Sequence, residues 1–243
     1  MNGFRTPQEA YSDAAAMPEF VGTTLLDTIG LVIPSVDAAL RAQMQPQPDC
    51  ACLGLISSRT GAAGQIVACD DAVKATASHI ISVELPRDTK GWGGHGNYIV
   101  LGGRDVSDVR RAIEIALALT KKHAGEVYIN EAGHLEFAYS ASAGEALHRA
   151  FEIPLGQAFG FMAGSPAAIG MVMADAAIKS ASVTLCRYMT PDCGTSHSNE
   201  VIIAFTGDAS AVKTAVLRGR EIGLTLLRQM GSEPKGPSEP YLQ

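Results

Sequence analysis

The sequence has few aromatic residues and no long apolar run, and these two absences exclude several classes of protein. Only 6% of its 243 residues are Phe, Trp or Tyr, with a single tryptophan, whereas alanine and glycine are frequent. No apolar run approaches the ~18–20 residues that a membrane-spanning helix needs. We therefore expect no membrane partner, and we expect cores of small side chains that let helices and subunits approach closely.

Basic residues are also in short supply. The chain contains 19 Lys and Arg against 25 Asp and Glu, and its formal net charge is −6. Proteins that bind nucleic acids concentrate positive charge against the phosphates. Because this chain has no long basic stretch, the sequence argues against a nucleic-acid partner.

The five cysteines do not indicate a disulfide framework or a zinc site. Their number is odd, and Cys50 and Cys52 lack the second pair that a structural zinc site requires. The first twenty residues lack the basic and then apolar order of a secretion signal. We interpret the cysteines as reduced thiols of a cytoplasmic protein, and we expect neither a cofactor nor a bound metal.

What the sequence does contain is an internal repeat. A short helix, a strand, a polar loop, a strand and a long helix are predicted in this order at two places about a hundred residues apart. Asp70 and Lys74 of the first copy correspond to Asp175 and Lys179 of the second, 105 residues further along the chain. A repeat of this length predicts two domains of the same fold.

The repeat suggests a division of the chain into four parts. We expect a flexible arm at residues 1–18, a first domain at 19–125, a second domain at 126–231 and a disordered tail at 232–243. The tail is rich in proline and serine and is expected to contribute nothing to a core.

Each half is predicted to be an α+β unit, in which an antiparallel sheet carries helices on one face. The clearest element is a long amphipathic helix at residues 106–123, whose apolar residues recur at helical spacing. Strands are expected at residues 52–57 and 65–68. Asp70 is expected to cap the helix that follows them, because a carboxylate can accept from the free N–H groups of a helix start.

No arrangement of residues indicates catalysis. Cys193 and His197 share a loop and could form a nucleophile and base, but their spacing in a loop fixes no geometry. The glycines between Gly91 and Gly96 resemble a phosphate-binding loop in composition, but they lie between two predicted strands and no helix follows. We therefore predict that the protein is not an enzyme.

Two loops occupy corresponding places in the two halves, at residues 86–96 and 191–198. Both are rich in Gly, Ser and Thr, and each contains one histidine. Exposed backbone groups and hydroxyls form a polar, mostly neutral surface that suits the passage or weak binding of small polar molecules. From the residues alone, ordinary surface loops remain an equal alternative.

These loops and the segments around them resemble a known family, the bacterial microcompartment shell proteins of the tandem-domain trimeric (BMC-T) type, and its PduB-like members above all. The resemblance runs from about residue 19 to about residue 231. The segments that carry it are EFVGTTLLDTIGLVI (19–33), ACDDAVKA (68–75), SVELPRDTKGWGGHG (82–96), LGGRDVSDVRR (101–111), NEAGHLE (130–136), GTSHSNE (194–200) and GREIG (219–223).

The resemblance implies a fold and a function. Each half would be a circularly permuted shell domain, and three chains would form a pseudo-hexameric homotrimer that tiles edge to edge with other shell proteins. The protein would then be a structural component of a microcompartment shell in the cytoplasm, with a pore for small polar metabolites. Its unequal loops could open and close that pore, and the N-terminal arm could attach encapsulated enzymes.

The resemblance also implies roles for particular residues. Lys74 and Lys179 correspond to the lysine at the tile edge of single-domain relatives. The residues implied to line the pore are Asp88, Thr89, Lys90, Gly91, Trp92, Gly93, Gly94, His95 and Gly96 in the first loop, and Asp192, Cys193, Gly194, Thr195, Ser196, His197 and Ser198 in the second.

Two other readings stay open on the sequence. Tandem α+β domains also occur in proteins that bind or sense small molecules, and such a protein would remain a discrete oligomer. An enzyme built on the loop of Cys193 and His197 is the third. The sequence does not identify the metabolite or the enclosed pathway.

Overall fold

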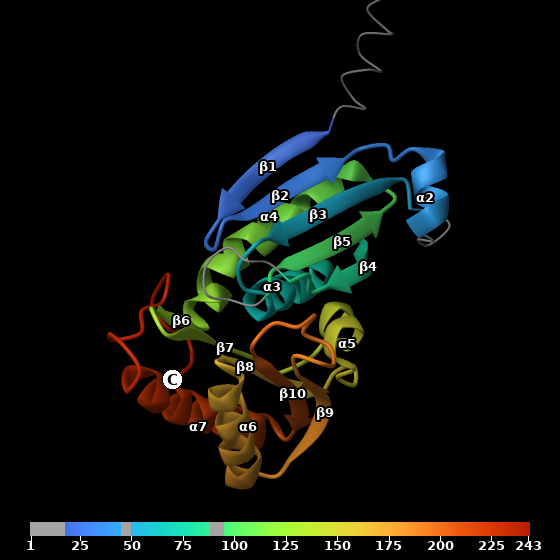
Figure 1. Ribbon diagram of the computed structural model, residues 1–243. Coiled ribbons are helices and arrows are strands. Elements are labelled where there is room, and N and C mark those ends of the chain that lie inside the picture. Colours follow the sequence, from blue (N-terminus) through green and yellow to red (C-terminus); the bar gives the residue numbers. More distant parts are fainter. Residues whose placement is uncertain (1–17, 45–49, 88–94) are drawn as a thin grey trace, which may run out of the picture.

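The computed structural model describes residues 18–44, 50–87 and 95–243 and contains two similar α+β units (Figure 1). The first unit is built on a five-stranded antiparallel sheet. In spatial order its strands are β1 (Glu19–Thr24), β2 (Thr28–Ile33), β3 (Cys52–Ser58), β5 (Asn97–Gly103) and β4 (Ser78–Glu84).

The second sheet repeats this order strand by strand. Ile56 pairs with Ile99 in the first sheet, and Met162 pairs with Ile203 at the corresponding place in the second. This agreement confirms the predicted internal repeat and the α+β class. The strands are β6 (Val127–Asn130), β7 (Gly133–Ser140), β8 (Ala158–Ser165), β10 (Val201–Gly207) and β9 (Val183–Met189).

Among the residues that the structure describes, each unit has one short and two longer helices. They are α2 (Ala38–Met44), α3 (Ala63–Lys74) and α4 (Val106–His123) in the first unit, and α5 (Glu145–Phe151), α6 (Ala167–Ser180) and α7 (Ala209–Arg228) in the second, with a 3₁₀ turn η1 (Ala124–Glu126) between the units. None of the helices in the described ranges is long and apolar enough to span a membrane.

The long helix predicted at residues 106–123 is confirmed as α4. Its apolar face, which includes Val109, Ile113 and Leu117, is buried against strands β1, β2 and β3. Gly54 of β3 permits this close approach, because a Cβ at this position would lie 2.9 Å from both Val109 and Ile113. The small residues of the sequence thus bring helix and sheet together.

The expectation of a strand at residues 65–68 is wrong, because these residues belong to α3. This helix has buried residues on nearly all its faces, including Ile66, Val67 and Val73. A helix that is surrounded by protein shows no amphipathic period, so a short apolar run within it resembles a buried strand. Asp70 consequently lies inside α3 and does not cap it.

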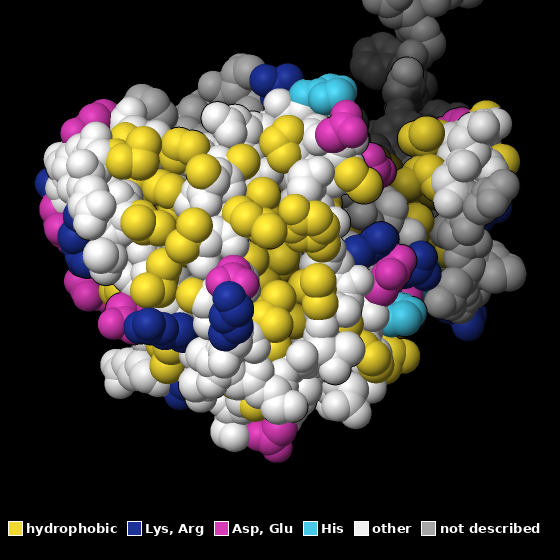
Figure 2. Space-filling view, turned by 60° about the horizontal axis from the view of Figure 1, so that its bottom comes forward, with side chains coloured by type: hydrophobic (Ala, Val, Ile, Leu, Met, Phe, Trp, Pro, Cys, Tyr) yellow, Lys and Arg dark blue, Asp and Glu magenta, His cyan; other side chains and the backbone are white. Residues whose placement is uncertain are grey.

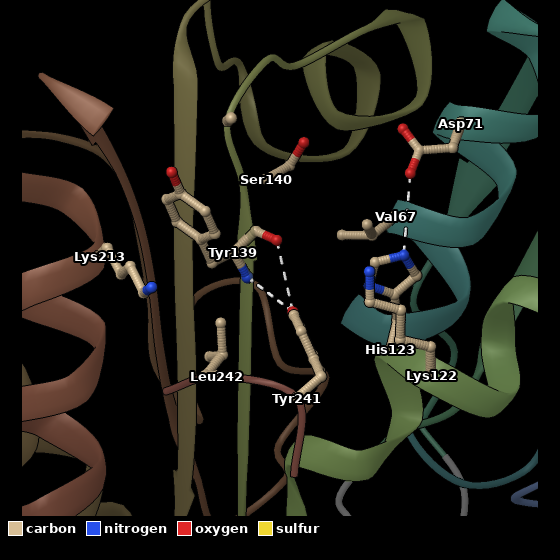
Figure 3. Close-up of a pocket in the computed structure, with 10 residues that line it drawn as sticks. Val67, Asp71, Lys122, His123, Tyr139, Ser140, Lys213, Tyr241 and Leu242 are labelled. Carbon is tan, nitrogen blue, oxygen red and sulfur yellow. Dashed lines mark hydrogen bonds and ion pairs between the residues drawn. The ribbon is translucent and has the colours of Figure 1, made fainter. Parts of the chain in front are cut away.

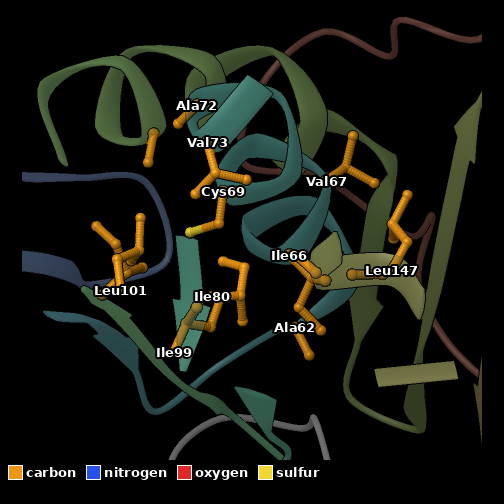
Figure 4. Packing of buried hydrophobic residues seen from close by; sticks show 14 of the residues in the cluster. Ala62, Ile66, Val67, Cys69, Ala72, Val73, Ile80, Ile99, Leu101 and Leu147 are labelled. Carbon is orange, nitrogen blue, oxygen red and sulfur yellow. The ribbon is translucent and has the colours of Figure 1, made fainter. Parts of the chain in front are cut away.

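The two units share one hydrophobic core around α3. A single cluster joins Ile66 and Ile80 of the first unit to Leu147, Phe151 and Phe161 of the second. Figure 4 shows residues of α3 and Leu147 within this cluster. Each fully buried side chain of this size contributes roughly 1.5–3 kcal/mol, so the joint between the units is as firmly packed as a domain interior.

The predicted disordered tail, residues 232–243, is instead packed on the second unit. Ile129 and Lys235 exchange backbone hydrogen bonds of 3.0 and 2.9 Å, so the tail pairs at this point with the edge strand β6. Tyr139 N–H donates to the Tyr241 hydroxyl at 3.1 Å, and Leu242 is buried. Composition indicated little regular structure, but an extended segment needs only an open sheet edge and a few apolar anchors to be held.

The N-terminal arm and the ends of the two domains are the other parts of the predicted division. Residues 1–17 of the expected N-terminal arm lie outside the described residues. The two sheets fall within the predicted ranges 19–125 and 126–231, and the ends of these domains stay predictions.

Candidate functional site

The first of the two matched loops, residues 86–96, joins β4 to β5. Its described ends meet, because Arg87 and His95 form an isolated antiparallel bridge and Gly96 N–H donates to the Pro86 carbonyl at 2.8 Å. A Cβ on Gly96 would lie only 2.1 Å from the Ser58 carbonyl oxygen, so this position requires glycine. Of the residues expected to line a pore here, Asp88 to Gly94 lie outside the described residues.

The second loop, residues 191–198, is a compact turn between β9 and β10. Thr190 and Cys193 exchange backbone hydrogen bonds of 2.7 and 3.0 Å, and the buried Thr195 hydroxyl donates to the carbonyls of Thr190 and Ser198. The structure therefore divides the expected pore residues into two groups. Thr195 and Ser198 are buried supports, whereas the exposed residues are Asp192, Cys193, Gly194, Ser196 and His197.

The backbone of the second loop has a positive φ at three exposed positions. Gly194, Ser196 and His197 have φ values of 97°, 50° and 65°. Such values are uncommon for residues other than glycine, so the loop holds its polar side chains outward at a conformational cost. Within the described part of the chain, no hydrogen bond joins Cys193 to His197, and no group of three His, Cys, Asp or Glu residues is placed to hold a metal.

A buried carboxylate connects the two loops. Glu200, which follows the second loop, lies 2.7 Å from Nδ1 of His95, the residue that closes the first loop. Its other oxygen lies 3.4 Å from Nε2 of His134 on β7. All three side chains are buried, so this cluster fastens the end of the first loop to the second unit.

The cluster shifts the pKa values of two members in opposite directions. Burial opposes the ionisation of Glu200, but the neighbouring His134 ring, the hydrogen bond with His95 and the charges of these two histidines hold its pKa far below the usual range. Burial likewise opposes protonation of His95, but the hydrogen bond to Glu200 and the charges of Glu200 and Glu136 raise its pKa overall. The cluster therefore behaves as a buried ion pair.

Asp70 and Lys74 lie at the joint between the two units. The Asp70 carboxylate accepts from the N–H groups of Gly144, Ala146 and Leu147 at 2.7, 2.9 and 3.2 Å. Asp70 thus caps α5 of the second unit, and sequence reasoning was right about its chemistry but wrong about its helix. Charge-assisted bonds of this kind are among the stronger ones in proteins.

Lys74 and Lys179, the two lysines expected at a tile edge, have different surroundings. Lys74 Nζ lies 2.8 Å from Asp70 and donates to the Ser142 carbonyl at 2.6 Å, within the joint. Lys179 is largely exposed and pairs with Asp175 at 2.7 Å. A place at a tile edge stays a prediction for both.

Two more carboxylates cross the joint. Glu136 of β7 accepts from the N–H groups of Ala62 and Ala63 at 3.0 and 2.8 Å and so caps α3. Glu145 of α5 accepts from Ile80 N–H at 2.9 Å. Sequence reasoning missed Glu136, Glu145 and Glu200, because the only signal was an acidic residue next to apolar ones.

The structure also contains a cavity of about 300 Å³ where α3, the end of α4, β7 and the tail meet (Figure 3). His123 reaches into it from α4, with Nε2 3.8 Å from Asp71. Burial lowers the pKa of His123, with the charge of Asp71 acting in the opposite direction. The other lining residues are Val67, Lys122, Tyr139, Ser140, Ala141, Lys213, Tyr241 and Leu242.

With this geometry described, comparison with known proteins places the chain in a family. The model of the BMC domain matches residues 52–132 and again residues 158–232, which together form more than half of the chain. The protein therefore belongs to the BMC-domain family, and it contains two such domains.

Curated relatives match over nearly the whole chain. Bacterial microcompartment shell protein PduB of Citrobacter freundii is 50% identical over 94% of this chain and 85% of its own length. The protein of the same name from Limosilactobacillus reuteri is 45% identical over 96% of this chain and 98% of its own length.

Solved structures agree with these relatives. A trimeric bacterial microcompartment shell protein PduB is 46% identical, with a TM-score of 0.88 and coverage of 93% of this chain and 100% of that chain. EtuB from Clostridium kluyveri is 48% identical, with a TM-score of 0.89 and coverage of 92% and 98%.

Proposed function

We propose that this protein is a structural shell protein of a bacterial microcompartment and resides in the shell of that cytoplasmic compartment. The observation that carries the proposal is the match of 94–96% of the chain, at 45–50% identity, to proteins that are named as microcompartment shell proteins. The chemistry of the site agrees, because its exposed groups are polar loops with no assembled catalytic residues among the described positions.

The proposed assembly is a homotrimer with six domains in a pseudo-hexameric ring, which tiles with other shell proteins. A related structure is described as trimeric. The two domains of this chain have the same sheet order, which supports a ring in which each chain supplies two successive positions. Lys74 and Lys179 are proposed to lie toward the tile edges.

The proposed pore is formed by the two matched loops, residues 86–96 and 191–198, around the centre of the ring. Exposed Asp192, Ser196 and His197 of the second loop would present polar groups suited to small polar metabolites. The contact between Glu200 and His95 would hold the two loops of one chain in a fixed position relative to each other. Opening and closing of the pore, and attachment of enzymes through residues 1–18, remain parts of the proposal that rest on the family resemblance.

A sensor with tandem domains is the alternative that the sequence left open, and the comparisons favour the shell protein over it. The two are separated by assembly. The experiment is light scattering of the purified protein, followed by electron microscopy at high concentration. A trimer of the 25.4 kDa chain that forms flat arrays or tubes is expected. A discrete oligomer that never tiles would contradict the proposal.

A further inference from the structure

The cavity between α3, the end of α4, β7 and the tail has more positive than negative charge in its wall. Lys122 and Lys213 line it, and Asp71 is the one carboxylate among its described lining residues. Asp71 is already 3.3 Å from the ammonium group of Lys74, which stands outside the lining. The charge that remains uncompensated in the wall is therefore positive.

Lys213 of α7 is the clearest unpaired cation of this wall. It is half-buried and has no ion pair or side-chain hydrogen bond within the described part of the chain. Its counterpart in α4, Arg110, lies 103 residues earlier and donates from Nε to Glu19 at 2.8 Å. In the second unit, Glu126 pairs instead with Arg220 at 2.9 Å, so no carboxylate is left for Lys213.

An unpaired cation is unusual for this protein. Figure 2 shows Lys and Arg side chains lying against Asp and Glu side chains on one face of the molecule. Lys179, for example, lies 2.7 Å from Asp175. A half-buried ammonium group that faces a cavity, with no carboxylate beside it, favours an anion at that place.

The opposite side of the cavity contains a second unsatisfied group. Figure 3 shows Lys213 projecting from α7 toward Tyr139, with His123 and Asp71 across the cavity from it. The His123 side chain is 8% exposed, and its Nδ1 atom is buried with no hydrogen-bond partner among the described residues. Buried polar groups normally have a partner, and a polar ligand in the cavity supplies one.

The tail holds the remaining wall of the cavity in place. Leu242 N–H donates to Glu126 at 2.7 Å, and Arg220 donates to the Leu242 carbonyl at 2.9 Å. The Tyr241 ring packs edge-on against His123, with ring centroids 5.1 Å apart and planes at 87°. Because these contacts fix the wall in advance, a ligand loses little free energy in ordering it.

We propose that this cavity binds a small organic anion, a carboxylate or a phosphate monoester, with the anionic group at Lys213 and the body of the molecule against Tyr139, Tyr241 and Leu242. Its volume of about 300 Å³ is at the lower end of the roughly 300–1,000 Å³ of ligand sites, which suits a molecule of modest size.

The site is separate from the loops proposed to line a pore. It includes Tyr139 and Ser140 at one end of β7, whereas His134, which contacts Glu200, is near the other end of this strand. Binding of the anion is therefore a property of the joint between the two units, and the proposed role in a shell does not require it.

The first test uses four probes that share a phenyl ring and differ in charge. They are phenyl phosphate, benzoate, benzyl alcohol and benzylamine. Calorimetric titration of the full-length protein is expected to show one site per chain for an anionic probe and no saturable binding of benzylamine. Binding of only one anion identifies the class as phosphate monoesters or carboxylates. Absence of saturable binding for both anions, or equal binding of benzylamine, would overturn the proposal.

The second test places the anion at Lys213. Lys213→Gln removes the charge and is expected to weaken binding of the anionic probe by roughly tenfold. Lys121→Gln is the matched control, because Lys121 is an exposed lysine next to Lys122 that does not line the cavity. Equal affinities in the wild type and in Lys213→Gln would contradict a contact between the anion and Lys213.

A third variant closes the cavity and leaves every charge in place. Ala141 is exposed and lines the cavity, so Ala141→Phe fills space there and is expected to abolish binding. Melting temperatures without a probe show whether each variant is folded, and a saturating anion should raise that of the wild type alone among these three proteins. Undiminished binding in both Lys213→Gln and Ala141→Phe would mean that the anions bind elsewhere on the surface.

Discussion

Asp70 and Asp175 occupy the same position in two helices of the same fold, yet their surroundings are opposite. Asp70 is buried, caps a helix of the other unit through three N–H groups and pairs with Lys74. Asp175 is exposed and pairs with the exposed Lys179. The comparison shows that the same Asp–Lys motif contributes differently to stability in the two units. Its contribution depends on the residues that pack against it.

The largest effect is expected where the buried partner is removed. Asp70→Ala leaves the three N–H groups at the start of α5 without their acceptor and removes the buried ion-pair partner of Lys74, and we expect a loss of about 4 kcal/mol in the free energy of unfolding. Asp175→Ala should change it by less than about 0.5 kcal/mol, because exposed pairs contribute little. Urea denaturation at a dilution where both variants are monomeric measures the difference. Equal losses would contradict the comparison.

Glu200 offers a second buried carboxylate at the joint, with a dependence on pH. Glu200→Gln is expected to cost about 3 kcal/mol near pH 6, because it leaves His95 and His134 without their ion-pair partner. The lowered pKa of Glu200 means that the contribution of the pair is present above the ordinary value of 4.5 and is lost at lower pH. The raised pKa of His95 means that it is present below 6.5 and is lost as pH rises through the raised value.

The wild type should therefore gain most from this pair between about pH 4.5 and 6.5, and the variant should lack that gain. Unfolding free energies measured from pH 4 to pH 9 provide the check. A difference between wild type and Glu200→Gln that stays constant over this range would mean that the cluster is not ionised as described.

A smaller loss of stability is expected from a larger side chain at Gly144, next to the Asp70 carboxylate that caps α5. Gly144→Ala places a Cβ 2.7 Å from Lys74 Cε and 2.8 Å from Asp70 Oδ1, and we expect a loss of about 2 kcal/mol. Gly22→Ala is the control, because its Cβ would meet its nearest neighbour, Leu117, at an ordinary 3.5 Å. Thermal unfolding of both variants is the measurement. Equal melting temperatures would show that the joint between the two units accommodates the added methyl group without loss of stability.

The smallest effect is expected at the tail. Tyr241→Phe leaves the Tyr139 N–H, which donates to the Tyr241 hydroxyl at 3.1 Å, without a partner, and we expect a loss of about 1 kcal/mol. Tyr188→Phe removes an exposed hydroxyl and should have almost no effect. Hydrogen exchange of the Tyr139 amide is the direct measurement. Unchanged protection in Tyr241→Phe would mean that the tail does not hold this strand.

The outcome of the predictions from sequence follows the range of the interactions involved. The helix at residues 106–123 was predicted because its apolar period is local and one of its faces meets solvent. The strand at residues 65–68 was wrong because α3 is covered by both units, and burial on all sides removes the period. Glu200 was missed, because its partners His95 and His134 are distant in sequence and an acidic residue next to apolar ones is a weak signal.

The tail shows a related limit. Its composition led to the expectation of a disordered segment that contributes nothing to a core. The segment is nevertheless held by the edge of β6 and by contacts of Tyr241 and Leu242. Composition indicates which secondary structure a segment can form by itself. It does not indicate whether the rest of the chain leaves an unpaired strand edge on which the segment can pack.

The sequence by itself determined the internal repeat, the α+β class, the long helices and the positions of the two polar loops, because these depend on patterns within a few dozen residues. Only the tertiary structure decided which surfaces of one unit are covered by the other unit. It placed Asp70 on the helix start of the other unit and Glu200 between two histidines, and it left Leu40 and Leu185 uncovered. The physical reason is that burial and pairing of a side chain depend on its distant neighbours, which two nearly identical motifs do not share.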